Sequence, residues 1–592
     1  MKRQIEEIEE KIKKSHKDQQ RRDEQQAIEN IKQNTRYFFS YANKKLKTTS
    51  AVGPLISQNG TLTGEPKEMS EILRKQYESV FSKANQEKLV SNPQDFFEET
   101  PNTGQQLTNI IIRETDIIAA IDEMAADAAA GPDGFHPQLL KRCKVELANP
   151  LKILWTESLA TGTVPGILKT GIITPIYKGG NRGTPSQYRP VVLTSHLIKI
   201  CERVIRKQIV EYLEINNLFN EGQHGFRQNR SCLSQLLVHY EGILRCIQEG
   251  NNADVIYLDF AKAFDKVDHG ILLHKLRSYG IHGQLGKWLH SFLSQRKQRV
   301  SVHGEPSEPS TVQSGVPQGS VLGPLLFLIH VGDIDKNLKH SEATSFADDT
   351  RIRKKTRNEN ETTQLQQDLD RIISWASENN MALNRDKFEL LRYGNNMDLK
   401  ERTAYLVSSH TIQDKDHVKD LGVHMSSDAS FTYHYNIITN AARQMSGWVL
   451  RTFETREEKC MITLWKTMIL PKLEYCCQLW SPHTITDITN IEAMQRTYTN
   501  KIRGVENMTY WERLRHLKLY SLQRRRERYI TIYVWKILEG IVPNVGLIEN
   551  THPRRGRLCF VRTTQGATQR VRTIVHNSFT YNGTRTFNCL PR

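Results

Sequence analysis

Residues 253–269 have the sequence ADVIYLDFAKAFDKVDH, and this stretch is the starting point for the fold. Residues 255–258 form a continuous apolar run, which is typical of a buried strand. Asp259 follows where that strand ends, and Ala263 and Phe264 are apolar positions of a helix-like segment after it. A carboxylate at the end of a buried strand suits a metal ligand. The alternative is an Asp that caps the following helix.

A second acidic segment is SFADDTRI, residues 345–352. Short strand-like runs flank the pair Asp348-Asp349, as in a hairpin. Two adjacent carboxylates repel each other, and a buried pair is costly unless a cation neutralises it. The segment therefore suits a divalent metal, with an ordinary Asp-rich turn as the alternative.

A third segment, SGVPQGSVLGPLLFLIHV at 314–331, combines a constrained loop with an apolar helix. Pro324 suits the first turn of that helix. Gln318 stands between Pro317 and Gly319, where backbone can approach a ligand closely. The alternative is a plain loop before a core helix.

The composition limits the class of protein. Of 592 residues, 82 are Lys or Arg and 65 are Asp or Glu, which gives a net charge of +17 and favours a nucleic-acid partner over a merely solvated basic surface. There is no run of about 18 apolar residues for a transmembrane helix. The charged start MKRQIEEIEEKIKK lacks the apolar core of a secretion signal. The nine cysteines have no disulfide-framework spacing, so reduced thiols are expected.

The pattern changes along the chain. Residues 1–34 predict a solvated helix with a thin apolar stripe, and a connector with one helix near 66–82 follows. Helical and strand-like segments alternate from about 110 to 425, as in an α+β domain. Beyond 430 the pattern is helical and increasingly basic, and the last 45 residues contain Arg clusters (Arg554, Arg555, Arg557) with little periodicity.

Taken together, the three segments resemble motifs A, B and C of reverse transcriptase palm domains. The chain is further similar to the reverse transcriptases of non-LTR (LINE-type) retrotransposons, in the Jockey-like and chicken-repeat-like branch, over about residues 35–590. The segments that support this are AAGPDGFHPQLL (129–140), VPGILKTGIITPIYKGG (164–180), QYRPVVLTS (187–195), QHGFRQNRSC (223–232), LEYCCQLWSP (473–482) and ERLRHLKLYSLQRRRER (512–528).

The resemblance implies an α+β right-hand polymerase, with fingers and palm built on antiparallel sheet and a helical thumb. The implied divisions are an N-terminal helix and connector at 1–105, fingers at 106–245, palm at 246–428 (reverse transcriptase domain overall about 159–428), thumb at 429–545 and a basic tail at 546–592.

The implied function is RNA-directed DNA synthesis from a DNA 3′ end by two-metal phosphoryl transfer. Asp259, Asp348 and Asp349 would hold two Mg²⁺ ions, with Mn²⁺ as a substitute. Lys387 matches motif D and would act as a general acid, although a surface Lys is the alternative. Deoxynucleoside triphosphates, an RNA template and a DNA primer would be the partners, in the cytoplasm as ribonucleoprotein and in the nucleus at target DNA.

Further roles also follow from the resemblance. Lys178 and Arg189 would clamp the triphosphate, and Gln318 would pack on the incoming nucleotide. Phe264 would exclude a ribose 2′-hydroxyl, a role compatible with a core aromatic. The primer grip would be Leu421, Gly422 and Val423. The basic residues expected to face nucleic-acid phosphates are Arg513, Arg515, Lys518, Arg524, Arg525, Arg526 and Arg528. Asp265 and Asp268 are expected to be salt-bridged surface positions on the helix after Asp259.

Some features depart from the family. Gly332 stands where Asn is common, and Phe388 where Thr or Ser is usual. No endonuclease-sized region precedes the connector, so a truncated copy or a partial gene is expected. An inactive RNA-binding relic and an intron-encoded maturase are the alternatives to an active polymerase.

Overall fold

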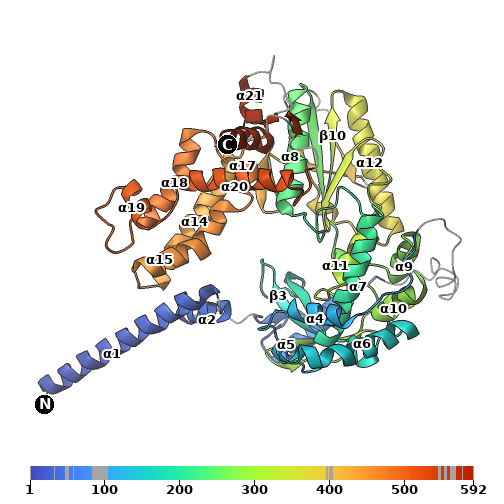
Figure 1. Cartoon of the computed structure of the whole chain (residues 1–592), viewed down its shortest axis with the longest axis horizontal. Helices are drawn as coiled ribbons and strands as arrows, with labels where there is room; N and C mark the ends of the chain where they lie inside the picture. Colours follow the sequence, from blue (N-terminus) through green and yellow to red (C-terminus); the bar gives the residue numbers. More distant parts are fainter. Residues whose placement is uncertain are drawn as a thin grey trace.

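The structure is a computed structural model of the whole chain, shown in Figure 1. It describes residues 2–32, 34–46, 52–57, 59–82, 105–394, 398, 404–407, 409–544, 549–552, 557–559, 569–576 and 578–590. Parts of the predicted connector (83–104) and of the predicted tail, including Arg554 and Arg555, lie outside these ranges. Among the described helices, none is both long enough and apolar enough to span a bilayer.

A five-stranded sheet forms the centre of the chain. Its strand order is β14 (Gln413–Asp414), β11 (Glu389–Tyr393), β5 (Asn252–Leu258), β10 (Asp349–Thr356) and β9 (Glu342–Phe346). All neighbours are antiparallel except β11 and β14. The strand predicted from residues 255–258 is therefore confirmed as β5, and the predicted hairpin as β9–β10.

β5 separates two hydrophobic cores, because successive side chains of a strand point to opposite faces. Ile256 and Leu258 belong to a first core, whose residues lie between Ile110 and Ile412. Ala253 and Val255 belong to a second core. This burial on both faces explains why the strand has no polar alternation.

Helices of the first core cover one face of the sheet and extend toward a second sheet. They are α4 (Glu114–Asp122), α5 (Pro137–Arg142), α6 (Lys144–Thr161), α7 (His196–Ile215), α9 (His269–Ser278), α10 (Gly283–Leu293), α11 (Gly323–Val331) and α12 (Glu359–Glu378). Pro324 lies in the first turn of α11, as predicted.

The second sheet lies beside these helices. Its order is β4 (Tyr188–Leu193), β3 (Thr170–Tyr177), β6 (Lys297–Val302) and β7 (Glu305–Pro306), and β8 (Ser310–Thr311) also pairs with β6. A small third core joins this sheet to α3 (Pro66–Glu78), the helix predicted near 66–82. The hairpin of β1 (Leu55–Ile56) and β2 (Leu62–Thr63) lies next to it, since Ile56 N donates to Gly183 O at 2.8 Å.

The second core is mainly helical and lies on the other side of the central sheet, around α8 (Cys232–Gln248). Its further helices are α14 (Thr432–Thr452), α15 (Glu458–Leu464), α16 (Leu470–Glu474), α17 (Cys477–Trp480), α18 (Ile485–Thr499), α20 (Leu522–Leu538), α21 (Gln569–His576) and α22 (Phe579–Asn588). Between α18 and α20 the chain also forms α19 (Tyr510–His516). The described residues also form three further two-stranded pairs: β12 (Leu406–Val407) with β13 (His410–Thr411), β15 (His417–Asp420) with β16 (Val423–Ser426), and β17 (Glu549–His552) with β18 (Arg557–Cys559).

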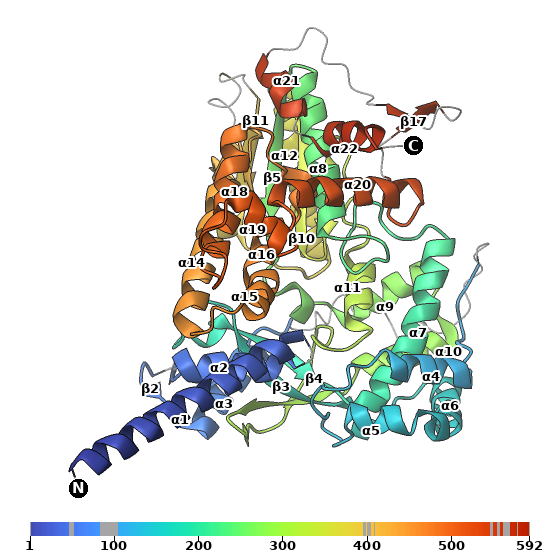
Figure 2. The same ribbon diagram turned by 60° about the vertical axis from the view of Figure 1, so that its left-hand side comes forward.

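The N-terminal helices are not a separate appendage throughout. α1 (Lys2–Glu29) projects from the body in both views, but its last turns and α2 (Thr35–Leu46) pack on the second core (Figures 1 and 2). The rings of Phe38 and Phe453 stack at 5.6 Å, and Glu24 accepts a hydrogen bond from Thr455 N at 2.7 Å. Residues 24–31 and 37–42 are thus part of a folded unit, which the thin apolar stripe of the sequence did not predict.

Candidate active site

A cleft of about 880 Å³ opens between the second sheet and the carboxyl end of β5. It brings together side chains that are far apart in the sequence. The predicted site residues that line it are Lys178, Arg189, Asp259, Phe264, Gln318, Asp348 and Lys387. Asp349 and Leu421 instead line a neighbouring pocket of about 320 Å³, to which Asp259 and Lys387 also contribute.

The acidic pair stands at the tip of the β9–β10 hairpin. Phe346 pairs with Asp349, so Ala347 and Asp348 form a two-residue turn. Thr350 pairs with Leu258, which places the end of β5, and hence Asp259, beside the start of β10. Three carboxylates that are separated by up to 90 positions in the sequence therefore meet at one edge of the sheet.

The electrostatics of this edge reflect burial and like charge. Burial raises the pKa of Asp348 to about 6, and the neighbouring charge of Asp349 acts in the same direction. Burial also raises the pKa of Asp349, against the opposing effect of Arg351. Both ionised carboxylates therefore require a positive partner.

Lys387 supplies a positive partner to the third carboxylate of this edge, Asp259. Its Nζ donates to Asp259 Oδ2 at 3.0 Å, and it lies on the short 3₁₀ turn Arg385–Lys387 that precedes β11. The backbone is tied to the same place, because Asn384 N donates to Asp259 O at 2.8 Å. The lysine predicted as a general acid thus lies in direct contact with a predicted metal ligand.

The donor chemistry of these residues fits a divalent cation. Within the described ranges, no group of three or more His, Cys, Asp or Glu side chains is already drawn together around one point. Nevertheless, the edge offers carboxylate oxygens of Asp259, Asp348 and Asp349, and oxygen ligands are those that Mg²⁺ prefers. The raised pKa values of two of them show that the edge favours added positive charge.

A basic wall faces the carboxylates across the cleft. Arg189 on β4 pairs in register with Ile176 on β3, and Lys178 follows the end of β3, where its N–H donates to Gln187 O at 2.9 Å. Burial, and secondarily the charge of Arg189, lowers the pKa of Lys178. Two cations held this close suit a polyanionic group such as a phosphate chain.

Phe264 forms part of the floor of the cleft. Its ring stacks on Phe327 of α11, with centroids 4.3 Å apart, and meets Phe226 edge-on at 6.1 Å. It packs against the first core and lines the cleft at the same time. The two roles expected for this aromatic are therefore compatible in the structure.

The prediction of a helix directly after Asp259 is wrong. Lys262 has a left-handed backbone (φ +53°), and Ala263–Asp265 is only a 3₁₀ turn. Asp268 lies outside a helix as well, and its carboxylate caps α9 by accepting from Ile271 N at 3.0 Å. Because Lys262 turns the chain, residues 263–265 line the cleft instead of lying on the surface.

The position of Asp265 follows from this turn and shows that a second expectation is wrong. It is not salt-bridged at the surface: it accepts from Gln318 Nε2 at 2.7 Å, and burial raises its pKa. The loop of Gln318 is pressed against β4, where Val192 N donates to Gln318 O at 2.7 Å. A Cβ on Gly319 would lie 2.3 Å from Val192 O, and φ is +133°, so only glycine fits.

The predicted primer grip is the β15–β16 hairpin. Leu421 (φ +43°) and Gly422 (φ +88°) form its two-residue turn, and Val423 is buried in the second core. Tyr475 fixes the turn, because its hydroxyl donates to Leu421 O at 2.9 Å. The preceding residue, Asp420, forms a buried ion pair with Arg351 of β10.

The basic residues of 513–528 do not form one exposed surface, which corrects the expectation for three of them. Arg513 and Arg526 are buried, and Arg525 is paired with Glu474. Arg513 donates to Met508 O at 2.7 Å. The members that are exposed are Arg515, Lys518, Arg524 and Arg528.

Comparisons with known proteins bear on this site. A protein-family model described as "Reverse transcriptase (RNA-dependent DNA polymerase)" matches residues 176–425, the stretch that contains all three carboxylates and the basic pair. The match takes in the central sheet, most of the second sheet and nearly all of the β15–β16 hairpin.

Several curated proteins resemble the chain beyond residues 176–425. The "Probable RNA-directed DNA polymerase from transposon X-element" of Drosophila melanogaster is 28% identical over 69% of this chain and 44% of its own length. The corresponding values are 25%, 74% and 49% for "RNA-directed DNA polymerase from mobile element jockey", and 25%, 71% and 48% for "Probable RNA-directed DNA polymerase from transposon BS", both from Drosophila melanogaster. The chain spans about half the length of these curated relatives.

Proposed function

We propose that the chain is the RNA-directed DNA polymerase of a non-LTR retrotransposon and adds deoxynucleotides to a DNA 3′ end on an RNA template. One observation carries the proposal: a single cleft contains two carboxylates of the acidic edge, Asp259 and Asp348, together with a facing basic pair and an aromatic floor. The matched reverse transcriptase family and the names of the relatives support the same activity.

The proposed architecture is that of a right-hand polymerase. Strands β3 and β4 of the second sheet, with α4 to α7, would belong to the fingers (106–245). The central sheet, together with β6 to β8, would form the palm (246–428), and α14 to α20 the thumb (429–545). Residues 24–32 and 34–42 would then join the thumb, and residues 52–57 and 59–82 the fingers, on the basis of the cores on which they pack.

Charge placement suggests how the residues act on a triphosphate. Arg189 and Lys178 would hold its phosphate oxygens, and the depressed pKa of Lys178 rises again when it meets this anion. Phe264 would pack under the sugar, where a 2′-hydroxyl has no room and no partner. Gln318, oriented by Asp265, would contact the incoming nucleotide.

Asp259, Asp348 and Asp349 would hold the Mg²⁺ ions, which when bound activate the primer hydroxyl and stabilise the leaving pyrophosphate. Lys387 now neutralises Asp259. With a cation bound there, the Lys387 ammonium would be free to turn toward the cleft, which it also lines, and would give a proton to the leaving group.

The β15–β16 hairpin and the exposed basic side chains of α19 and α20 would hold the nucleic acid. Trp511 and Tyr520 are exposed among them, and Arg524 lies over the Tyr520 ring at 5.6 Å. Exposed aromatics between cations suit stacking on unpaired bases next to a phosphate track.

Primer extension on an RNA template tests the proposal. The wild type should extend a DNA primer with Mg²⁺, and Asp348→Asn/Asp349→Asn should not. Asp370→Asn, an exposed carboxylate on α12, is the control and should extend normally. Extension by the double variant would contradict the proposal, and template binding without extension by the wild type would favour an inactive relic.

A further inference from the structure

The segment between α7 and α8 docks on the hairpin of β9 and β10. His224 N donates to Ser345 O at 2.8 Å, and Ser345 N donates to Gly222 O at 2.9 Å. This short parallel pairing covers the outer edge of β9, which is the edge strand of the central sheet. The docked segment includes one buried amide side chain, Gln223.

The Gln223 amide binds both backbone polar groups of Ala347. Its Oε1 accepts from Ala347 N at 2.9 Å and from Gly225 N at 2.8 Å. Its Nε2 donates to Ala347 O at 3.3 Å. Since Gln223 is only 5% exposed and Ala347 6%, water does not compete for these bonds.

Ala347 is the residue whose backbone direction decides where Asp348 points. It is the first of the two turn residues, and its φ of +57° is a conformation that favours glycine. An L-residue in the left-handed region is strained, because its Cβ comes close to the following carbonyl oxygen. The Gln223 hydrogen bonds offset this strain and select the one turn geometry that carries Asp348 into the cleft.

Two glycines let the segment approach the hairpin this closely. A Cβ on Gly225 would lie 2.4 Å from Ala347 N, and one on Gly222 would lie 2.6 Å from Ala343 O. No side chain fits in either gap, so glycine on both sides of Gln223 is a requirement of the docking. This gives the QHGFR stretch at 223–227 a physical role.

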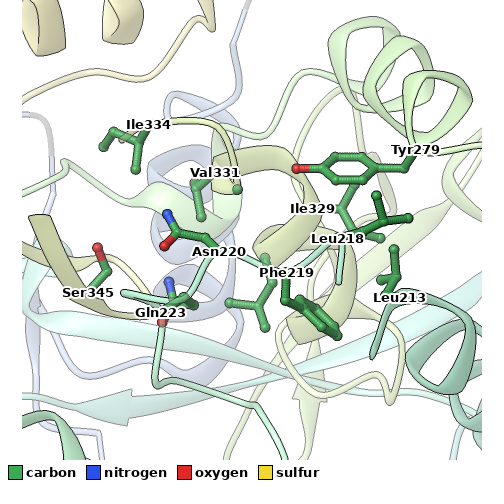
Figure 3. Close-up of a pocket in the computed structure, with 12 residues that line it drawn as sticks. Leu213, Leu218, Phe219, Asn220, Gln223, Tyr279, Ile329, Val331, Ile334 and Ser345 are labelled. Carbon is green, nitrogen blue, oxygen red and sulfur yellow. The ribbon is translucent and has the colours of Figure 1, made fainter. Parts of the chain in front are cut away.

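Gln223 also lines a small cavity behind the hairpin. Figure 3 shows Gln223 beside Ser345 on one side, with Leu218 and Tyr279 on the other. The cavity holds about 10 Å³, room for at most one water molecule. The cavity leaves little space for water beside a side chain as long as Gln223, so replacing the amide by an apolar group of that length leaves the turn unsupported.

We propose that Gln223 is a positioning residue for the polymerase reaction, which fixes the turn at Ala347 and thereby presents Asp348 to the cleft. Gln223 lines neither the cleft nor the neighbouring acidic pocket and acts only through the backbone of Ala347. This inference rests on the proposed function for its catalytic part.

Three variants separate positioning from general stability. Gln223→Met keeps the length of the side chain and removes all three hydrogen bonds. Gln223→Glu keeps the acceptor for Ala347 N and Gly225 N. The matched control is Gln495→Met, which removes a buried amide that donates to Tyr520 O at 3.0 Å in the second core, far from the hairpin.

The first readout does not depend on activity. Hydrogen exchange of the peptide that contains Ala347 should accelerate at least about tenfold in Gln223→Met, less in Gln223→Glu, and not in Gln495→Met. Mn²⁺ binding, followed by electron paramagnetic resonance, should weaken in the same order. Unchanged exchange and unchanged Mn²⁺ affinity in Gln223→Met would overturn the inference even if the wild type had no polymerase activity.

The second readout is the split between kcat and KM in primer extension. Gln223→Met should lower kcat about tenfold or more, with KM for the deoxynucleotide nearly unchanged, because a small displacement of a catalytic group is costly. A wild-type kcat in Gln223→Met would overturn the inference and leave the proposed function intact. Loss of extension in the wild type would instead contradict the proposed function alone.

Discussion

Arg351 and Asp420 form a buried ion pair between the strand of the acidic pair and the turn of the β15–β16 hairpin. The Arg351 side chain is 1% exposed and that of Asp420 is 3% exposed. Arg351 Nη2 also donates to Gln235 Oε1 at 3.0 Å. The perturbation that tests this link is Arg351→Met, which keeps an apolar stem and removes the charge.

The magnitude follows from the burial of both partners. Removing one member of a buried pair costs about 3–5 kcal/mol, because the other charge is left without a partner. The pKa of Asp420 is already raised to about 6 by burial while Arg351 is present, so the carboxylate depends on that cation. Replacing both groups, as in Arg351→Met/Asp420→Leu, should cost less than about 2 kcal/mol.

Hydrogen exchange at increasing urea measures the opening free energy of β10 and of the β15–β16 hairpin separately. Arg351→Met should loosen both. Lys144→Met, which breaks the exposed Lys144–Asp122 pair (2.7 Å), is the control and should cost less than about 1 kcal/mol. The two hairpins are not linked by this pair if Arg351→Met loosens β10 alone. The same holds if the stability lost in the double variant equals the sum of the losses in Arg351→Met and Asp420→Leu.

Three further outcomes are expected. Phe264→Val should raise the ratio of ribonucleotide to deoxynucleotide incorporation about tenfold or more in single-nucleotide assays, since a smaller side chain admits the 2′-hydroxyl. An unchanged ratio would contradict the role proposed for Phe264. Neutralising Arg515, Arg524 and Arg528, the exposed arginines of α19 and α20, should reduce the salt dependence of RNA binding. The slope of log K against log salt should fall by up to about 0.7 per lost phosphate contact. Arg526→Met should instead lower the stability of the fold and leave this slope unchanged. Burial lowers the pKa of His224 to about 3, so as the pH drops the unfolded chain binds a proton at this histidine before the folded chain does. The free energy of unfolding should therefore fall by about 1.4 kcal/mol per pH unit between about pH 6.5 and pH 3. If His224→Gln does not flatten the pH dependence of thermal unfolding, this expectation is contradicted.

Local patterns predicted those parts of the fold that depend on neighbours in sequence. The apolar run before Asp259 is β5, the segment around Asp348 is a hairpin tip, and Pro324 lies in the first turn of α11. Where the backbone departs from its usual region, pattern fails: Lys262 has a positive φ, and the predicted helix becomes a turn.

The sequence patterns do not predict which residues distant in the chain come into contact. Gln223 and Ala347 are 124 positions apart, and no periodicity marks either. Arg526 has the same letter as its exposed neighbour Arg524, yet only the first is enclosed by the second core. A run of arginines predicts charge on a helix, but which of them face solvent depends on what the helix packs against.

The make-up of the second core has a consequence for the order in which the chain folds during synthesis. That core includes Ala27 and Phe38 near the start and Phe579 near the end, whereas the first core is complete at Ile412. Translation proceeds from the N-terminus at about 5–20 residues per second, so the first core can form while the ribosome is still at work. Phe38 and its neighbours must wait, with their apolar faces uncovered, until most of the chain has emerged. Nascent chains arrested after Ile412 but before Phe579 should therefore bind chaperones through residues 27–42. They should release the chaperones once the helices up to Phe579 have been synthesised.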